Sequence, residues 1–166
     1  MTITIILADD HQIVRQGLRT LLAGEPDMQV VGEADDGRKT LKLTQELAPD
    51  VVIMDISMPD INGIEATRQL LVESPGVKVI ALSMHSDSLF VLNMLRSGAL
   101  GYLLKDCALE ELVKAIRTVM RQQTYISPGV SDLLIQDLAC RCTAEPSSAY
   151  SVLTTREREV LQLLAA

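Results

Sequence analysis

The chain has 166 residues, of which 48% are hydrophobic and 22% charged, and its formal net charge is -7. This length allows one full domain with a hydrophobic core, and the remainder is too short for a second domain of ordinary size. The acidic balance argues against a large nucleic-acid footprint in this chain.

Membrane and metal signatures are missing from the sequence pattern. No apolar run approaches the roughly 20 residues that a helix needs to cross a bilayer. The first residues lack the basic region of a signal peptide and reach acids by residue 9. The cysteines at positions 107, 140 and 142 have no second Cys or His pair to complete a zinc site. We therefore expect a cytoplasmic protein with reduced thiols and no membrane contact.

Short β-rich runs alternate with amphipathic stretches from residue 3 onward, a pattern typical of βα units and a parallel sheet. Strands are predicted over residues 3–8, 28–34, 50–55, 77–83 and 101–105. Helices are predicted over residues 11–24, 38–48, 63–74, 86–98 and 108–122. A further short helix is predicted over 131–139, followed by a flexible linker.

This (βα)5 pattern predicts an α/β fold, a doubly wound parallel sheet of flavodoxin-like strand order 2-1-3-4-5. In that order, a crevice opens between the first and third strands at their carboxyl ends. The unbroken hydrophobicity of residues 50–54 suits a central strand that is covered on both faces. Functional side chains are therefore expected where the strands end.

Polar residues stand at the ends of four of the predicted strands. They are Asp9 and Asp10, Asp55, Ser83 and Lys105. Three carboxylates at close range repel one another, so the site is reasonable if Mg²⁺ binds among them and an ammonium adds positive charge. Such an arrangement can also transfer a phosphoryl group to an aspartate, with the cations neutralising the phosphoryl oxygens. Asp55 is then the expected acceptor.

Each of these residues has a plainer interpretation when it is considered alone. Asp9 and Asp10 would suit the N-terminus of a helix. Lys105 would be a solvated charge, Ser83 a routine hydroxyl at a strand end, and Tyr102 a packing residue. Their convergence on one edge of the sheet favours a functional site.

The Asp9-Asp10 pair, the run Asp55-Ile-Ser-Met-Pro-Asp-Ile-Asn-Gly, Ser83 and Lys105 together resemble the receiver domain of two-component response regulators. The resemblance covers roughly the first 122 residues. It implies that a sensor histidine kinase phosphorylates Asp55. Met84 stands where receivers often have a small residue, which predicts narrower access to the acceptor.

Further site roles are implied by the same resemblance. Mg²⁺ would be held by the carboxylates of Asp10 and Asp55 and by the main-chain carbonyl of Ser57, with Asp9 assisting through water. Ser83 and Lys105 would hold the phosphoryl oxygens. Tyr102 matches the aromatic position that acts as a switch with the hydroxyl residue. Phosphorylation would promote a homodimer, through the first and fifth helices or through the fourth helix, fifth strand and fifth helix.

Residues 150–166 resemble the opening of a LuxR-type helix-turn-helix domain, as found in NarL/FixJ regulators. Thr154 and Glu157 form a capping box, and Val160, Leu161 and Leu164 form an apolar stripe. The sequence ends before the recognition helix, so we expect DNA binding of the full-length protein and not of this truncated chain. The expected domains are a receiver (1–122), a linker with a short helix (123–150) and a helix-turn-helix fragment (151–166).

Other functions fit the sequence less well. A haloacid-dehalogenase-like Mg²⁺ phosphatase would carry a D-x-D motif in which the first acid is the nucleophile and the second is the general acid. Here Ser57 stands at the position of the second acid, so the general acid is missing. A dinucleotide-binding site is not supported, because no G-x-G-x-x-G motif follows the first strand. A corrinoid-binding motif, D-x-H-x-x-G, would begin at Asp9 and His11, but Val14 stands where its glycine belongs. A receiver that acts only as an interaction module is disfavoured because every matched residue is present. His11 and His85 are expected at the surface, because no Cys, His or acid stands at a metal-ligand interval that would use them.

Overall fold

A computed structural model describes residues 1–107, 109–144, 160 and 163–164. Six parallel strands form one sheet in the order β2-β1-β3-β4-β5-β6. The strands are β1 (Ile3–Ala8), β2 (Met28–Ala34), β3 (Val51–Asp55), β4 (Lys78–Ser83), β5 (Gly101–Leu104) and β6 (Tyr125–Ile126). The helices are α1 (Gln12–Ala23), α2 (Gly37–Leu47), α3 (Gly63–Glu73), α4 (Ser88–Arg96), α5 (Leu109–Met120) and α6 (Pro128–Ala144).

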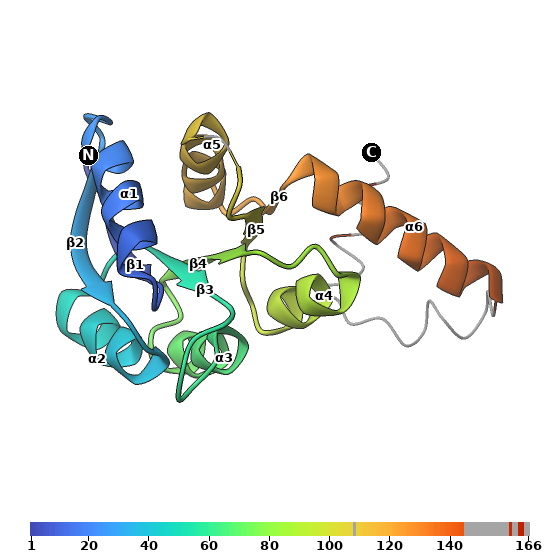
Figure 1. Cartoon of the computed structure of the whole chain (residues 1–166), viewed down its shortest axis with the longest axis horizontal. Coiled ribbons are helices and arrows are strands. Elements are labelled where there is room, and N and C mark those ends of the chain that lie inside the picture. The colour runs from blue at the N-terminus through green and yellow to red at the C-terminus, as the bar shows by residue number, and fades with distance from the viewer. Residues whose placement is uncertain (108, 145–159, 161–162, 165–166) are drawn as a thin grey trace.

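Helices cover both faces of the sheet, with α1 and α5 on one side and α2, α3 and α4 on the other (Figure 1). The alternation of side chains along β1 explains the two layers. Ile5 and Leu7 pack in the core beneath α1 and α5, whereas Ile6 and Ala8 pack in the opposite layer. All five residues of β3 are buried, as a central parallel strand requires.

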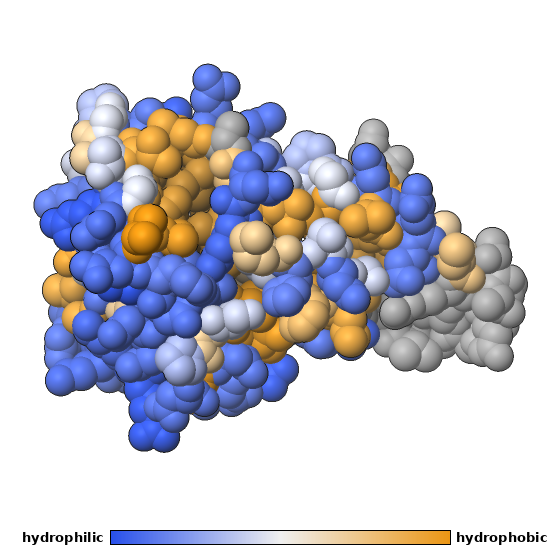
Figure 2. Space-filling model, in the orientation of Figure 1, coloured by the Kyte–Doolittle hydropathy of each residue, from blue (hydrophilic) through white to orange (hydrophobic). Residues whose placement is uncertain are grey.

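An apolar groove lies between α1 and α5, where hydrophobic side chains gather on the face shown in Figure 2. Its lining includes Leu18 and Leu21 from α1 and Leu109 and Leu112 from α5. Leu21 is 43% exposed, so part of this apolar surface is open to solvent. The groove lies on one of the two surfaces at which the family resemblance implies a homodimer.

Side-chain caps fix where three helices begin. Asp36, Asn62 and Asp87 precede α2, α3 and α4, and each side chain accepts a hydrogen bond from a main-chain N–H in the first turn. These bonds satisfy N–H groups that have no partner within the helix. His11 holds the corresponding position before α1, but its side chain forms no capping bond.

The predicted fold is confirmed, and the ten expected elements form with ends shifted by at most two residues. Two features differ from the expectation. β6 adds a sixth strand beside β5, with Tyr102 paired to Ile126. α6 is longer than the helix expected over 131–139, because it begins at Pro128, a residue favoured in the first turn. A strand of two residues has too little alternation to be predicted from sequence.

The segment after β6 packs against the α3–α4 side of the sheet. Val130, Leu134 and Leu138 of α6 are buried in the same core layer as α4, and Ser88 Oγ donates a 2.9 Å hydrogen bond to Asp137 Oδ2. Sheet pairing thus continues past residue 122, and the domain boundary there remains a prediction. The expected capping box in residues 154–157 lies outside the described residues. None of the described helices is long and apolar enough to cross a membrane.

Candidate functional site

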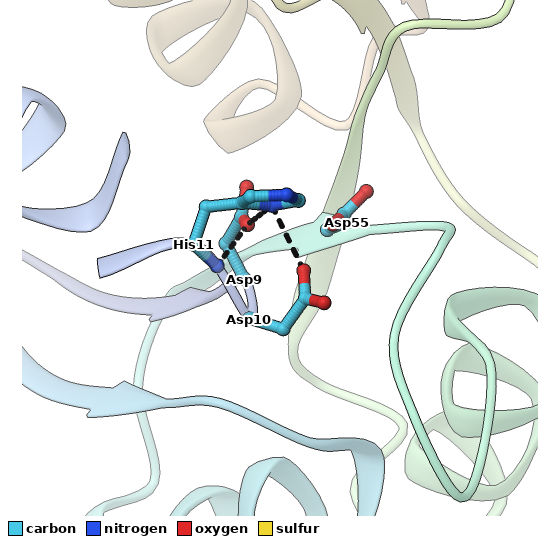
Figure 3. A group of neighbouring side chains, drawn as sticks. All are labelled: Asp9, Asp10, His11 and Asp55. Carbon is cyan, nitrogen blue, oxygen red and sulfur yellow. Dashed lines mark hydrogen bonds and ion pairs between the residues drawn. The ribbon is translucent and has the colours of Figure 1, made fainter. Parts of the chain in front are cut away.

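The carboxyl ends of the strands gather the predicted acids at the crevice between β1 and β3. Asp9 and Asp10 follow β1, and Asp55 is the last residue of β3. One potential ligand atom from each of these acids and from His11 lies within 4.8 Å of the others (Figure 3). Because β1 is hydrogen-bonded to β2 on one side and to β3 on the other, this is the point where the strand order reverses and parallel sheets bind their ligands.

Lys105, which follows β5, reaches back into this cluster. Its Nζ lies 2.8 Å from Asp9 Oδ2 and 3.1 Å from Asp55 Oδ2. All three side chains are buried, with exposed fractions of 10%, 3% and 2%. The two Oδ2 atoms accept no hydrogen bond of good geometry within the described residues. The single ammonium offsets only part of the charge of the two buried carboxylates, so the cluster keeps an excess of negative charge.

The pKa values of the cluster follow from burial and from these charges. Burial raises the pKa of Asp55, repulsion from Asp9 raises it further, and attraction to Lys105 offsets only part of the rise. Burial also acts to raise the pKa of Asp9, but contact with Lys105 and hydrogen bonds from His11 outweigh it and hold that pKa below its usual value. Burial acts to lower the pKa of Lys105, yet the two carboxylates together hold it above its usual value.

The loop after β3 holds Asp55 in place. The main-chain N–H of Ser57 donates to Asp55 Oδ1 at 3.2 Å, and the N–H of Gly63 donates to the carbonyl of Ile56 at 2.8 Å. Gly63 lies so close to β3 that a Cβ atom there would stand 2.1 Å from the carbonyl oxygen of Asp55. Only glycine allows α3 to begin this close to the acceptor.

Ser83 and Tyr102 meet at the loop between β4 and α4. Ser83 Oγ accepts a 3.0 Å hydrogen bond from the main-chain N–H of His85, and the Tyr102 hydroxyl donates to the carbonyl of the same residue at 2.6 Å. Both side chains are buried. Burial is also the largest cause of the raised pKa of Tyr102. Ser83 lies one residue beyond Leu82, the β4 residue paired with Asp55, and so lies at the same edge of the sheet.

Three residues in and around the site were not predicted to take part. His11 is exposed, as expected, but the expectation that no acid stands at a suitable interval from it is wrong. The Asp-Asp-His run at the end of a strand could have indicated this contact. Arg15 donates to the carbonyl of Asp9 at 2.6 Å. His85 Nε2 lies 3.4 Å from Ser57 Oγ, and its ring stacks on Phe90.

Met84 is the residue expected to narrow access to the acceptor. It directly follows β4, and it is 73% exposed. An exposed and unbranched side chain can adopt several rotamers, so its effect on access depends on which of them is populated. Narrower access to Asp55 because of Met84 stays a prediction.

Comparisons with known proteins agree with this geometry. The response regulator receiver domain model matches residues 5–117. The transcriptional regulatory protein DegU of Brevibacillus brevis is 40% identical over 176 residues, which cover 98% of this chain and 74% of DegU. The response regulator GacA of Pseudomonas aeruginosa is 41% identical over 165 residues, covering 98% of this chain and 75% of GacA.

Solved structures give the same result. A two-component response regulator of the LuxR family from Aurantimonas has 36% sequence identity and a TM-score of 0.79, over 82% of this chain and 98% of that chain. The matched residues 5–117 contain Asp9, Asp10, Asp55, Ser83 and Lys105. The phosphatase and interaction-module alternatives are not favoured by these matches. The chain belongs to the response regulator family of two-component systems, and it contains a receiver domain of the NarL/FixJ type.

Proposed function

We propose that the receiver acts as a phosphorylation switch in which Asp55 is the phosphoacceptor and a sensor histidine kinase is the donor. The observation that supports this most directly is the position of Asp55, buried at the end of the central strand and 3.1 Å from the Lys105 ammonium. A carboxylate oxygen of Asp55 would attack phosphorus, and the phosphorus–nitrogen bond to the donor histidine would break. The adjacent ammonium favours the charged, nucleophilic form of Asp55.

Mg²⁺ is the cofactor that fits the cluster. The carboxylates of Asp9, Asp10 and Asp55 outnumber the Lys105 ammonium, and buried oxygens of two of them lack hydrogen bonds within the described residues. Hard oxygen ligands of this kind suit Mg²⁺, which when bound would neutralise the phosphoryl oxygens. In our proposal Asp10, Asp55 and the main-chain carbonyl of Ser57 hold the ion, and Asp9 assists through water.

Lys105 and Ser83 would bind the phosphoryl oxygens. The Ser83 hydroxyl now accepts a hydrogen bond from His85, so its own proton is available to donate to an oxygen of the phosphoryl group. A shift of Ser83 toward Asp55 would strain the loop that Tyr102 holds through the His85 carbonyl. Phosphorylation would then favour a different arrangement of this loop and of Tyr102, and so shift an existing equilibrium.

The output of the switch is proposed to be dimerisation and transcription control. In this proposal, residues 1–122 form the receiver, 123–150 the linker and 151–166 the beginning of a DNA-binding domain. A homodimer would form on phosphorylation, and the proposed partners of the regulator are a sensor histidine kinase and DNA. The protein would work in the cytoplasm. It would be a phosphoacceptor, with at most slow self-dephosphorylation as activity of its own.

Intact-protein mass spectrometry tests the acceptor. The chain is incubated with acetyl phosphate and Mg²⁺, in parallel with Asp55→Asn and with the matched variant Asp60→Asn, whose side chain pairs with Arg38 outside the cluster. One phosphoryl adduct is expected in the parent and in Asp60→Asn, and none in Asp55→Asn or after addition of EDTA. An adduct that persists in Asp55→Asn at full yield would contradict the assignment.

The role of Tyr102 has a separate test. Tyr102→Ala removes the hydrogen bond to the His85 carbonyl while leaving every residue of the acidic cluster in place. We expect the phosphoryl adduct to form as in the parent, and the phosphorylation-dependent increase in dimer, measured by analytical ultracentrifugation, to shrink. An unchanged increase would remove Tyr102 from the switch.

A further inference from the structure

Arg15 is a cation close to the N-terminus of a helix, where the opposite charge is favoured. It is the fourth residue of α1, and its main-chain N–H donates to the carbonyl of His11 at 3.1 Å. The N-terminal end of a helix carries partial positive charge and favours acidic side chains, yet the first turn of α1 contains none. Only 15% of the Arg15 side chain is exposed, so its charge needs partners within the protein. Helix stability therefore does not explain an arginine at this position.

The guanidinium group of Arg15 joins two elements at once. Side chains on a helix point back toward its N-terminus, so Arg15 reaches the turn that precedes α1. Its Nη1 donates to the main-chain carbonyl of Asp9 at 2.6 Å, and its Nε donates to Glu33 Oε2 on β2 at 3.2 Å. Because a guanidinium presents its N–H groups in a rigid fork, one side chain holds both acceptors in a fixed relation. The end of β1 is thus fixed to β2 one residue beyond their last pair, Ala8 with Ala34.

The Asp9 carbonyl is a point at which a small rotation would disturb the site. It belongs to the peptide unit that links Asp9 to Asp10, and it lies past the residues that β1 pairs with its neighbours. On the same residue, Oδ1 accepts a 2.8 Å hydrogen bond from the main-chain N–H of His11 (Figure 3), and Oδ2 lies 2.8 Å from Lys105 Nζ. Rotation of this peptide unit would change the turn that holds the Asp9 carboxylate. The hydrogen bond from Arg15 restrains that rotation.

Arg19 offers a comparison within the same helix. It lies one turn after Arg15 on the same side of α1, and its Nη1 donates to Glu33 Oε1 at 2.7 Å. Its side chain is 62% exposed, and no hydrogen bond joins it to Asp9 in the part of the chain that the structure describes. Both arginines therefore anchor α1 to β2 through one carboxylate. The contact with the Asp9 main chain distinguishes Arg15 from Arg19.

We propose that Arg15 is a positioning residue for the phosphorylation of Asp55 and acts through the main chain of Asp9. This role deepens the proposed function and rests on Asp55 being the phosphoacceptor. Lys105 Nζ lies between the two acids, 2.8 Å from Asp9 Oδ2 and 3.1 Å from Asp55 Oδ2, so the place of Asp9 determines where the ammonium lies. With Arg15 present, Asp9 holds the ammonium beside the acceptor. Without Arg15, the turn before α1 rotates more freely, and the ammonium follows Asp9 away from the acceptor.

Three variants separate this role from simple anchoring of the helix. Arg15→Gln removes the fork, and Arg15→Lys keeps the positive charge but cannot hold both acceptors. Arg19→Gln is the matched control, because it also removes one arginine from Glu33 but leaves the Asp9 contact in place. Urea unfolding gives the folded fraction of each variant. Intact-protein mass spectrometry measures the rate of adduct formation with acetyl phosphate, and NMR hydrogen exchange of the His11 main-chain N–H reports on the Asp9 turn without any phosphoryl donor.

Arg15→Gln should slow adduct formation by at least about tenfold, approaching the roughly 100-fold that a misplacement of about 1 Å can cost, and should speed exchange of the His11 N–H. Arg19→Gln should change both rates by less than about twofold, because its contact is exposed. Arg15→Lys should remain closer to Arg15→Gln than to the parent in both measurements.

Three results would overturn the positioning role. They are parent-like rates in folded Arg15→Gln, equal losses in Arg15→Gln and Arg19→Gln, and full recovery in Arg15→Lys, which would mean that charge alone suffices. Absence of the Asp55 adduct in the parent would instead count against the proposed function. Exchange of the His11 N–H would even then decide whether Arg15 holds the Asp9 turn.

Discussion

Replacing Gly63 by alanine should separate the role of a close backbone contact from that of helix propensity. Gly63 is the first residue of α3, and a Cβ atom there would lie 2.1 Å from the Asp55 carbonyl oxygen and 2.8 Å from Ile56 Cα. Real Cβ atoms essentially never approach other heavy atoms closer than 3.0 Å, so the start of α3 must move by about 0.9 Å. Both obstacles are main-chain atoms of the loop that holds the acceptor, and neither can rotate away.

The magnitude follows from this geometry. Forcing an extra carbon into a packed site typically costs about 1–3 kcal/mol, and contact with main chain on two sides places Gly63→Ala near the upper end. We expect the free energy of unfolding to fall by about 3 kcal/mol, which for a chain of this size lowers the Tm by roughly 6–12 °C. Because the clash displaces Asp55, the rate of phosphoryl adduct formation should fall as well.

Urea unfolding followed by circular dichroism measures the effect, with Gly17→Ala as the control. Gly17 lies in α1, and a Cβ atom at this position would have no neighbouring atom within 4 Å, so alanine there should raise the free energy of unfolding by about 0.5–1 kcal/mol. The two substitutions should therefore have opposite signs. If the free energy of unfolding of Gly63→Ala stays within about 0.5 kcal/mol of the parent value, the close contact with the Asp55 main chain does not require glycine at position 63.

Three further predictions concern other parts of the molecule. Ser88→Ala should lower the free energy of unfolding by about 1 kcal/mol, because α4 loses its hydrogen bond to α6, and the Asp55 adduct should form as before. The pKa of Glu33 is lowered chiefly by its hydrogen bond with Arg19 of α1, so this carboxylate stabilises the fold above its unfolded pKa and loses that contribution as the pH falls below about 4.5. In urea titrations, Glu33→Gln should be less stable than the parent at pH 7 by less than about 1 kcal/mol, and this difference should shrink as the pH is lowered below about 4.5. Burial raises the pKa of Cys107 to about 11, two units above 9.0, so peptide mapping should find its alkylation by iodoacetamide about a hundredfold slower than that of an ordinary thiol.

The fold could be predicted because its signals are local and repeated. Five apolar runs that alternate with helical periodicity determine a parallel sheet, and the β1–β3 crevice follows from the strand order. β6 and the first turn of α6 could not be predicted, because their positions depend on tertiary pairing. Tyr125 and Ile126 become a strand only where β5 presents a free edge beside them. No periodic pattern within two residues carries that information.

The site could be predicted in outline but not in its contacts. Asp9, Asp55 and Lys105 belong to one edge because parallel strands bring their carboxyl ends together. The ion pairs of Lys105 with both acids depend on side-chain reach across the crevice, which the sequence does not encode directly. The contact of His11 with the acids depends on a turn that folds residue 11 back onto residue 9. Spacing along the chain does not reveal that turn, so sequence reasoning places His11 at the surface without a role.

The shortness of β6 has a consequence for how the protein behaves at high concentration. A sheet edge with several unpaired N–H and C=O groups can recruit a strand from another molecule and begin aggregation. On this side the sheet ends in two residues, and the chain turns at once into α6 through Pro128, which has no N–H to offer. Figure 1 shows α6 leading directly away from that edge. The same segment that extends the sheet therefore leaves only a strand of two residues at this edge for intermolecular pairing, whereas β2 forms the opposite edge.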